Sequence, residues 1–178
     1  MGRDKAALQL CGVPLATRLA RLLTPLFGEL LLVGGRAPAG TPGRRVSDPE
    51  GTACALRGMV GALEAARAEQ VLVVAVDLPA LSADLLLALT AFPAADAVVP
   101  RAPDGRLQPL CALYRREPVL AVARGNLADQ KLRLSALLAA LEVRVLEGEE
   151  LARADPAGRA LTNVNTAEAW RAFCGETP

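Results

Sequence analysis

The apolar run VLVVAV at residues 71–76 most constrains the fold of this chain. A short run of branched apolar residues is typical of a strand buried on both faces of a sheet. Further strand-like segments lie at 29–33, 96–100, 108–114 and 143–147. Because helix-like segments separate most of them, the sequence predicts an α/β fold with a mostly parallel, doubly wound sheet and a small antiparallel part.

The predicted helices follow from apolar periodicity and from capping residues. Ser82 and Thr166 are suitable N-caps, and Pro14 suits a first helical turn. The expected helices cover 13–27, 52–68, 82–92, 131–142 and 167–174. The glycine- and proline-rich segment between 34 and 45 is expected to be a loop. A length of 178 residues without internal repeats predicts one domain, 1–178.

Composition excludes several classes of function. No uninterrupted apolar run approaches the roughly 18 residues of a membrane span, and no apolar signal-peptide region is visible, so a cytoplasmic protein is expected. The net charge is +1 with the two signs interspersed, which argues against a nucleic-acid partner. The cysteines are widely spaced without a CxxC pair and are expected to be reduced, mostly buried thiols; they are Cys11, Cys54, Cys111 and Cys174.

The chain contains no histidine. This excludes Ser-His-Asp and Cys-His nucleophilic catalysis and every metal motif that requires histidine. Chemistry must therefore rest on carboxylates, lysine, arginine, backbone amides and a hard metal ion.

Asp77 directly follows the strongest predicted strand. Ligands of open α/β sheets bind outside the carboxyl ends of the strands, so its carboxylate is expected at the rim of the sheet. One carboxylate there suits Mg²⁺, which is commonly held by one or two carboxylates together with substrate phosphates and water. The alternative is that Asp77 only ends the strand by binding nearby amides.

Two other positions are open to a functional and an ordinary interpretation. Val46 could end a short edge strand and place Asp48 on the same rim, but Asp-Pro is also a common turn opener. Lys5 and Lys131 are the only lysines among the 20 basic residues. A compact ammonium group suits a phosphate, although two lysines can also persist by chance.

Four segments resemble the molybdenum cofactor guanylyltransferases in order and spacing. They are MGRDKAALQLCGVPL at 1–15, VVAVDLPAL at 73–81, LQPLCALYRR at 107–116 and TNVNTAEAW at 162–170. The resemblance covers nearly the whole chain. It implies a Rossmann-like nucleotidyltransferase fold and transfer of GMP from GTP to molybdopterin carrying molybdenum, with release of pyrophosphate. It also implies Mg²⁺ as cofactor, and a molybdenum-insertion protein or molybdoenzyme chaperones as further partners.

The resemblance assigns roles residue by residue. Lys5 would contact the GTP phosphates, Asp48 would contribute to guanine-nucleotide binding, and Asp77 would bind the metal. Asn163 and Asn165 match the segment toward the pterin, although asparagine is also ordinary in turns and helix entries. Two loops depart from the family pattern, at Gly34–Gly35 and at Cys54–Ala55, and both changes bear on the selectivity for guanine.

Family members carry a strand and a glycine-rich LAGGxSxR loop immediately before the segment that opens this sequence. We therefore expect the native protein to be longer by a strand and a loop, and the 178-residue form to be nearly inactive. Without such a strand, the segments 29–33 and 71–76 would pair directly or expose their edges.

Three other functions are compatible with the residues. The first is a related nucleotidyltransferase that uses CTP or a sugar phosphate. The second is a non-catalytic protein that binds or delivers molybdopterin, and the third is an α/β scaffold without a ligand.

Overall fold

The structure, a computed structural model, describes residues 5–35, 37–47, 51, 54–92, 95–164 and 167–175. The helices are η1 (Lys5–Ala7), α1 (Leu15–Leu23), α2 (Ala55–Ala65), α3 (Ala83–Thr90), α4 (Arg116–Ala128), α5 (Leu134–Leu138), α6 (Gly148–Ala154) and α7 (Ala167–Gly175). The strands are β1 (Gln9–Leu10), β2 (Val13–Pro14), β3 (Leu31–Val33), β4 (Arg44–Val46), β5 (Gln70–Val74), β6 (Ala97–Pro100), β7 (Cys111–Arg115) and β8 (Val143–Leu146). Among the described residues, no helix is long and apolar enough to cross a membrane.

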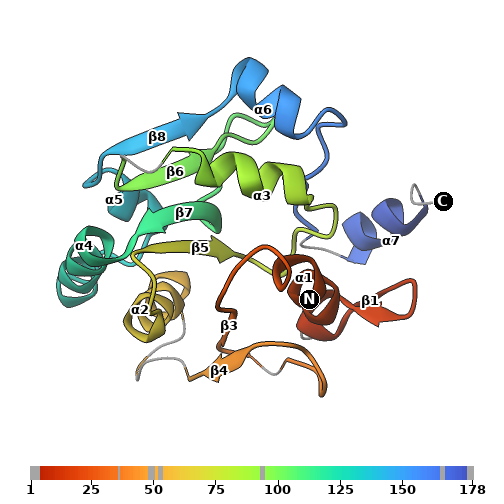
Figure 1. Ribbon diagram of the computed structural model, residues 1–178, viewed down its shortest axis with the longest axis horizontal. Helices are drawn as coiled ribbons and strands as arrows, with labels where there is room; N and C mark the ends of the chain where they lie inside the picture. Colours follow the sequence, from red (N-terminus) through yellow and green to blue (C-terminus); the bar gives the residue numbers. More distant parts are fainter. Residues whose placement is uncertain are drawn as a thin grey trace.

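Four strands form the main sheet, in the order β5-β7-β6-β8 (Figure 1). Strand β7 is antiparallel to both of its neighbours, with Val73 opposite Ala112 and Val98 opposite Leu113. Strands β6 and β8 are parallel. The expected α/β class is therefore confirmed, and the sheet is mixed, with β7 as its antiparallel member.

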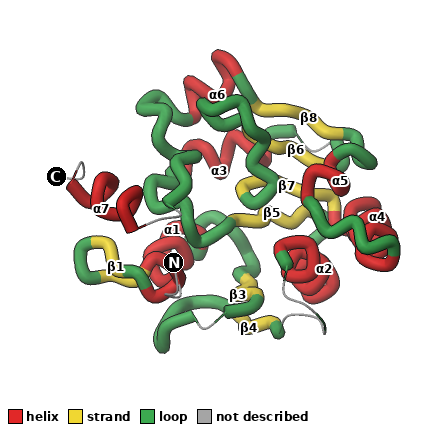
Figure 2. Tube along the Cα trace, turned by 180° about the vertical axis from the view of Figure 1, so that it is seen from behind, coloured by secondary structure: helices red, strands yellow, loops and turns green. Residues whose placement is uncertain are grey.

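Helices cover both faces of this sheet, and the side chains of successive residues alternate between them. Val98 and Leu113 pack into a core with α1, α3 and α6. Val99 and Tyr114 point to the other face, into a core with α2, α4 and α5. Figure 2 shows the second face, with α5 lying over the strands. This two-sided burial explains why β6 and most of β7 consist of buried residues.

Strands β3 and β4 form a separate parallel pair, and β1 and β2 form a short antiparallel hairpin. The pair lies on the β5 side of the main sheet, and β3 is the nearer strand (Figure 1). As predicted, Val46 ends a short strand. Among the residues that the structure describes, the segments 29–33 and 71–76 do not pair directly.

Several expected elements need correction. The helix expected over 131–142 is confined to Leu134–Leu138, because Lys131 donates its backbone N–H to Asn126 and thereby closes the end of α4. Helices α4 and α6 were not predicted. By contrast, Ser82 caps α3 as expected, and its Oγ accepts from the backbone N–H of Leu85 at 3.3 Å.

The expectation of mostly buried thiols is wrong. Only Cys111 is buried, Cys54 is half-buried, and Cys11 and Cys174 are exposed. All four are free, as expected. The error arises because Cys11 lies in the turn between β1 and β2, and Cys174 lies in α7. Both elements are at the periphery of the molecule (Figure 1).

Candidate active site

Asp77 lies in the turn that follows β5, rather than directly at the end of the strand. The strand ends at Val74, although Ala75 still donates its N–H to the carbonyl of Leu110 at 2.7 Å. The Asp77 Oδ1 atom is buried, and the next residue, Leu78, is only 4% exposed. The packed Leu78 side chain therefore anchors the turn that holds the carboxylate at this edge.

The C-terminal part of the chain returns to this turn. Val164 donates its backbone N–H to the carbonyl oxygen of Asp77 at 2.9 Å. Its side chain is 2% exposed and packs with Val76 and Ala80 on either side of Asp77. Asn163, half-buried, immediately precedes this contact. The residue after Asn163 thus contacts Asp77 through its backbone, although the two positions are far apart in the sequence.

The N-terminal part reaches the same edge. Leu8 and Leu10 belong to the small core that contains Val76 and Val164. Leu15 donates its N–H to the carbonyl of Leu8 at 2.8 Å, which fixes this segment to the start of α1. The structure describes only the backbone of Lys5, which opens η1 three residues earlier. The segment with the predicted phosphate-binding lysine therefore lies beside the Asp77 turn.

Two of the residues expected at the site, Asp48 and Asn165, lie outside the described residues. Strand β4 ends at Val46, two residues before Asp48. The roles of Asp48 and Asn165 remain predictions.

Two arginines at this edge were missed by the sequence interpretation. Arg18 and Arg21, on the exposed side of α1, line a hollow of about 300 Å³ together with Val76 and Pro79. Arg18 also lines a second hollow of about 400 Å³, together with Pro79 and Arg159. Their spacing of three on a predicted helix was the available signal, because such residues share a face. The first hollow has a cationic wall suited to an anionic ligand, whereas the second is lined by Asp84 and Asp155 as well as by arginines.

The donor set is consistent with Mg²⁺. Among the described residues, no three His, Cys, Asp or Glu side chains gather as a metal-binding group. Asp77 supplies one carboxylate, with one oxygen buried at the rim. One carboxylate with room for phosphates and water suits Mg²⁺, whereas a structural zinc site needs four protein ligands.

The buried thiol of Cys111 cannot act as a nucleophile at neutral pH. Desolvation by burial raises the pKa of Cys111 to about 12. Since the thiolate is the reactive form, Cys111 is a structural core residue.

The fold of this chain is that of the Rossmann-like nucleotidyltransferases, and its charged side chains gather beyond the carboxyl end of β5. The chain belongs to the MobA-like NTP transferase family, since the family model for the MobA-like NTP transferase domain matches residues 1–145. Nucleotidyl transfer is the chemistry of the family.

Known proteins agree with this assignment. A Bacillus licheniformis protein, named a probable molybdenum cofactor guanylyltransferase, is 38% identical over 96 residues. The match covers 53% of this chain and 48% of that protein, so the chain spans about half the length of this curated relative.

Two solved structures share the fold. Molybdopterin-guanine dinucleotide biosynthesis protein A from Archaeoglobus fulgidus has a TM-score of 0.80 at 18% identity, covering 99% of this chain and 93% of its own. The 2-C-methyl-D-erythritol 4-phosphate cytidylyltransferase from Thermus thermophilus has a TM-score of 0.71 at 20% identity, covering 96% of this chain and 92% of its own. At these identities the likeness concerns the fold alone.

Proposed function

We propose that this protein transfers GMP from GTP to molybdopterin carrying molybdenum, forming the guanine dinucleotide cofactor and pyrophosphate. The named relative from Bacillus licheniformis supports this choice within the family. The LQPLCALYRR and TNVNT segments, which carried the resemblance to guanylyltransferases, support it further.

The reaction places modest demands on the protein. A phosphate oxygen of molybdopterin attacks the α-phosphorus of GTP. The new P–O bond forms as the bond to the bridging oxygen of the β-phosphate breaks, and pyrophosphate leaves. Because the attacking phosphate is already ionised at neutral pH, no strong general base is needed. Catalysis then consists of holding two anionic substrates in line and compensating the charge that develops.

The residues at the edge of the sheet would share these tasks. Asp77 would hold Mg²⁺, which supplies charge neutralisation at the phosphates when bound. Lys5 would contact the GTP phosphates, and Asp48 would contribute to guanine recognition. Asn163 and Asn165 would face the pterin. Arg18 would add positive charge beside Pro79.

One observation carries the proposal most directly. The Val164–Asp77 hydrogen bond joins the predicted pterin segment to the predicted metal segment. The core around Val76 brings the Lys5 segment to the same place. Segments far apart in sequence thus meet where an α/β sheet binds its ligands.

Removal of the Asp77 charge tests the proposal. In protein purified from its own cells, Asp77→Asn should lower pyrophosphate release from GTP and molybdopterin by about 10²–10³-fold, because phosphate charge is no longer compensated. Asp129→Asn is a matched control, since Asp129 forms an exposed ion pair with Lys131 at 2.9 Å. Near-normal turnover by Asp77→Asn would remove Asp77 from the mechanism.

Substrate competition separates the alternatives. Equal pyrophosphate release from CTP and GTP would replace guanylyl transfer with the broader nucleotidyltransferase activity. Molybdopterin binding without any pyrophosphate release would favour a delivery protein. GTP-dependent release well above that with CTP, ATP or UTP is the expected result.

A further inference from the structure

Strand β8 forms one edge of the main sheet. It pairs in parallel with β6, from Val143 opposite Ala97 to Leu146 opposite Pro100. Among the described residues, β8 has no strand partner on its other side. Both views show it as the outermost strand of the sheet, followed by α6 at its end (Figures 1 and 2). The outer backbone edge of β8 is therefore open in the described part of the chain.

The backbone groups on this outer edge belong to Val143 and Val145. The carbonyls of Glu142 and Leu146 accept hydrogen bonds from backbone N–H groups on the β6 side, at 3.1 and 3.0 Å. Successive residues of a strand direct their N–H and C=O groups to alternate edges. The groups of Val143 and Val145 therefore face away from β6 and can pair with a further strand.

The sequence at this edge is complementary to itself. It is LEVRV at 141–145, with half-buried Leu141, Val143 and Val145 alternating with exposed Glu142 and Arg144. Read from either end, the segment has apolar residues at the same places, while the acidic and basic positions exchange. Two identical strands related by a two-fold axis are antiparallel and meet in this manner. The pattern is therefore suited to pairing between two copies of the chain.

The charges select one register for such a pair. With the two-fold axis at Val143, this residue lies opposite itself, and Glu142 lies opposite Arg144 twice. Those two charges then form a pair without backbone hydrogen bonds, with Cα atoms about 4.5 Å apart and side chains in contact. An axis at Arg144 would instead place two arginines directly opposite each other, which is destabilising.

Arg144 is already oriented by its own chain. Its Nη2 atom donates to both carboxylate oxygens of Glu150, at 2.9 and 2.7 Å. The guanidinium carbon lies 5.0 Å from the centre of the Phe92 ring. An uncompensated charge on an edge strand opposes pairing with another chain, and Glu150 compensates this one. Because Glu150 uses one guanidinium nitrogen, the other two can donate to a further carboxylate.

We propose that the β8 edge is an interface between two copies of this chain. Strand β8 of each copy pairs in antiparallel fashion around a two-fold axis at Val143, which joins the two four-stranded sheets into one continuous sheet. Glu142 of each copy binds Arg144 of the other. An interface built on one short strand is small, so the dimer is weak and depends on concentration. The inference is independent of the proposed reaction.

Analytical ultracentrifugation of charge-reversal variants tests the interface. The parent protein should pass from dimer to monomer between about 500 and 5 µM. Glu142→Arg and Arg144→Glu should each be monomeric across this range, because both place like charges opposite each other. An equimolar mixture of the two variants should form dimers again, since every charge then meets its opposite. Circular dichroism checks that both variants are folded.

Arg153→Glu is the control for charge reversal. Arg153 lies on α6, and its side chain is 76% exposed beside Glu149. This variant should dimerise like the parent protein. A parent protein that stays monomeric throughout the range, or a dimer that persists unchanged in Glu142→Arg, would overturn the proposal.

Cross-linking tests the register without depending on the charge variants. The exposed thiols are first removed by Cys11→Ser and Cys174→Ser. In the proposed dimer, the two copies of Val143 have Cα atoms about 5.5 Å apart, whereas those of Val145 are offset by about 14 Å along the strands. A short bifunctional methanethiosulfonate should therefore link Val143→Cys into covalent dimers at least about tenfold more efficiently than Val145→Cys. Equal yields from both variants, or no dimer from Val143→Cys, would overturn the proposal.

Discussion

The two lysines of the chain lie in different parts of the fold. Lys131 pairs with Asp129 at 2.9 Å, and 60% of its side chain is exposed. Such an exposed pair contributes little to stability, and Lys131 is therefore a solvated surface charge rather than part of the candidate site. Lys5, in contrast, opens η1, and the segment after it packs beside the Asp77 turn. The position of Lys5 is therefore the more consistent with a role toward substrate.

Under the proposed function, Lys5→Ala should reduce guanylyl transfer by about a hundredfold or more, because Lys5 is proposed to supply a cation near the developing phosphate charge. Steady-state pyrophosphate release by protein from its own cells measures the effect. Lys131→Ala is the matched control, since it removes the other lysine and should leave the rate unchanged. Equal losses in both variants would point to a general effect of net charge.

The position of Asp77 illustrates what a strand-end pattern can predict. The pattern placed the end of the strand at Val76, two residues beyond the observed end of β5 at Val74, because Ala75 and Val76 are as apolar as the strand itself. The contact between Val164 and Asp77 was not predictable, because it joins backbone groups 87 positions apart. Arg18 and Arg21 were missed because arginine is abundant in this chain and therefore uninformative.

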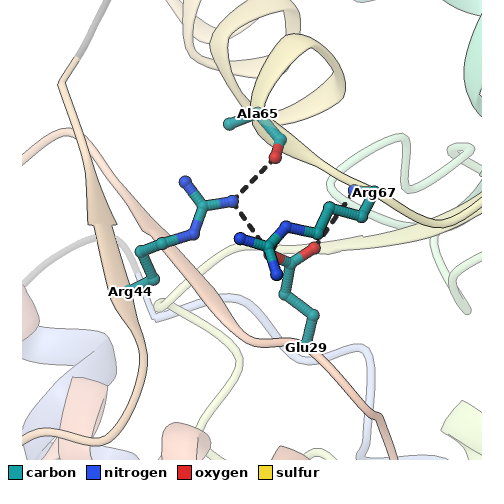
Figure 3. Close-up of polar contacts among 4 residues, drawn as sticks. All are labelled: Glu29, Arg44, Ala65 and Arg67. Carbon is teal, nitrogen blue, oxygen red and sulfur yellow. Dashed lines mark hydrogen bonds and ion pairs between the residues drawn. The ribbon is translucent and has the colours of Figure 1, made fainter.

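Among the elements, the β3–β4 pair is joined to α2 by the cluster of Glu29, Arg44 and Arg67 (Figure 3). The hydrogen bond from the Arg44 side chain, with the backbone hydrogen bond from Arg67, lowers the pKa of Glu29 below its usual value. The stability that this carboxylate contributes is therefore present above its unfolded-state pKa, and it is lost as the pH falls through the lower folded-state pKa.

Glu29→Gln should accordingly destabilise the protein at pH 7, and the difference from the parent chain should shrink as the solution is acidified below pH of about 4. Urea denaturation across this range measures the free energy of unfolding. Glu149→Gln is a suitable control, because the Glu149 side chain is 95% exposed. A difference between Glu29→Gln and the parent that is independent of pH would contradict the assignment.

Helix α4 shows why one element escaped sequence analysis. Its Gly125 and β-branched Val119 and Val122 have low helix propensity, so local preference gave no signal. The helix forms because Val119 and Ala123 are fully buried against the sheet. Tertiary packing overrides propensity here. The strands β6 and β8, in contrast, were predictable, because their apolar residues are confined to short runs.

At the scale of the whole molecule, alternation of strand and helix predicted the α/β class but not the strand order. The antiparallel insertion of β7 between β5 and β6 depends on long-range pairing that periodicity does not encode. Because of this pairing, four strands form the main sheet, and β3 and β4 form a separate two-stranded sheet. The two parts should differ in local stability.

Hydrogen exchange followed by mass spectrometry should reveal this difference. Amides of β6 and β7, which have neighbours on both edges, should exchange about tenfold or more slowly than those of β3 and β4. Peptides covering 97–115 and 31–46 report the two regions in one experiment. Equal rates would show that the pair and the main sheet open as one unit.

The hydrogen bond from Val164 to Asp77 also bears on how this polypeptide can be handled in the laboratory. Because the chain comes back to β5 so late in its course, Val164 supports the turn that holds Asp77. Truncation of the chain after Ala160, or fusion of a reporter protein at that point, would remove the hydrogen bond from Val164 to Asp77. Tags on this protein therefore belong on a linker beyond α7.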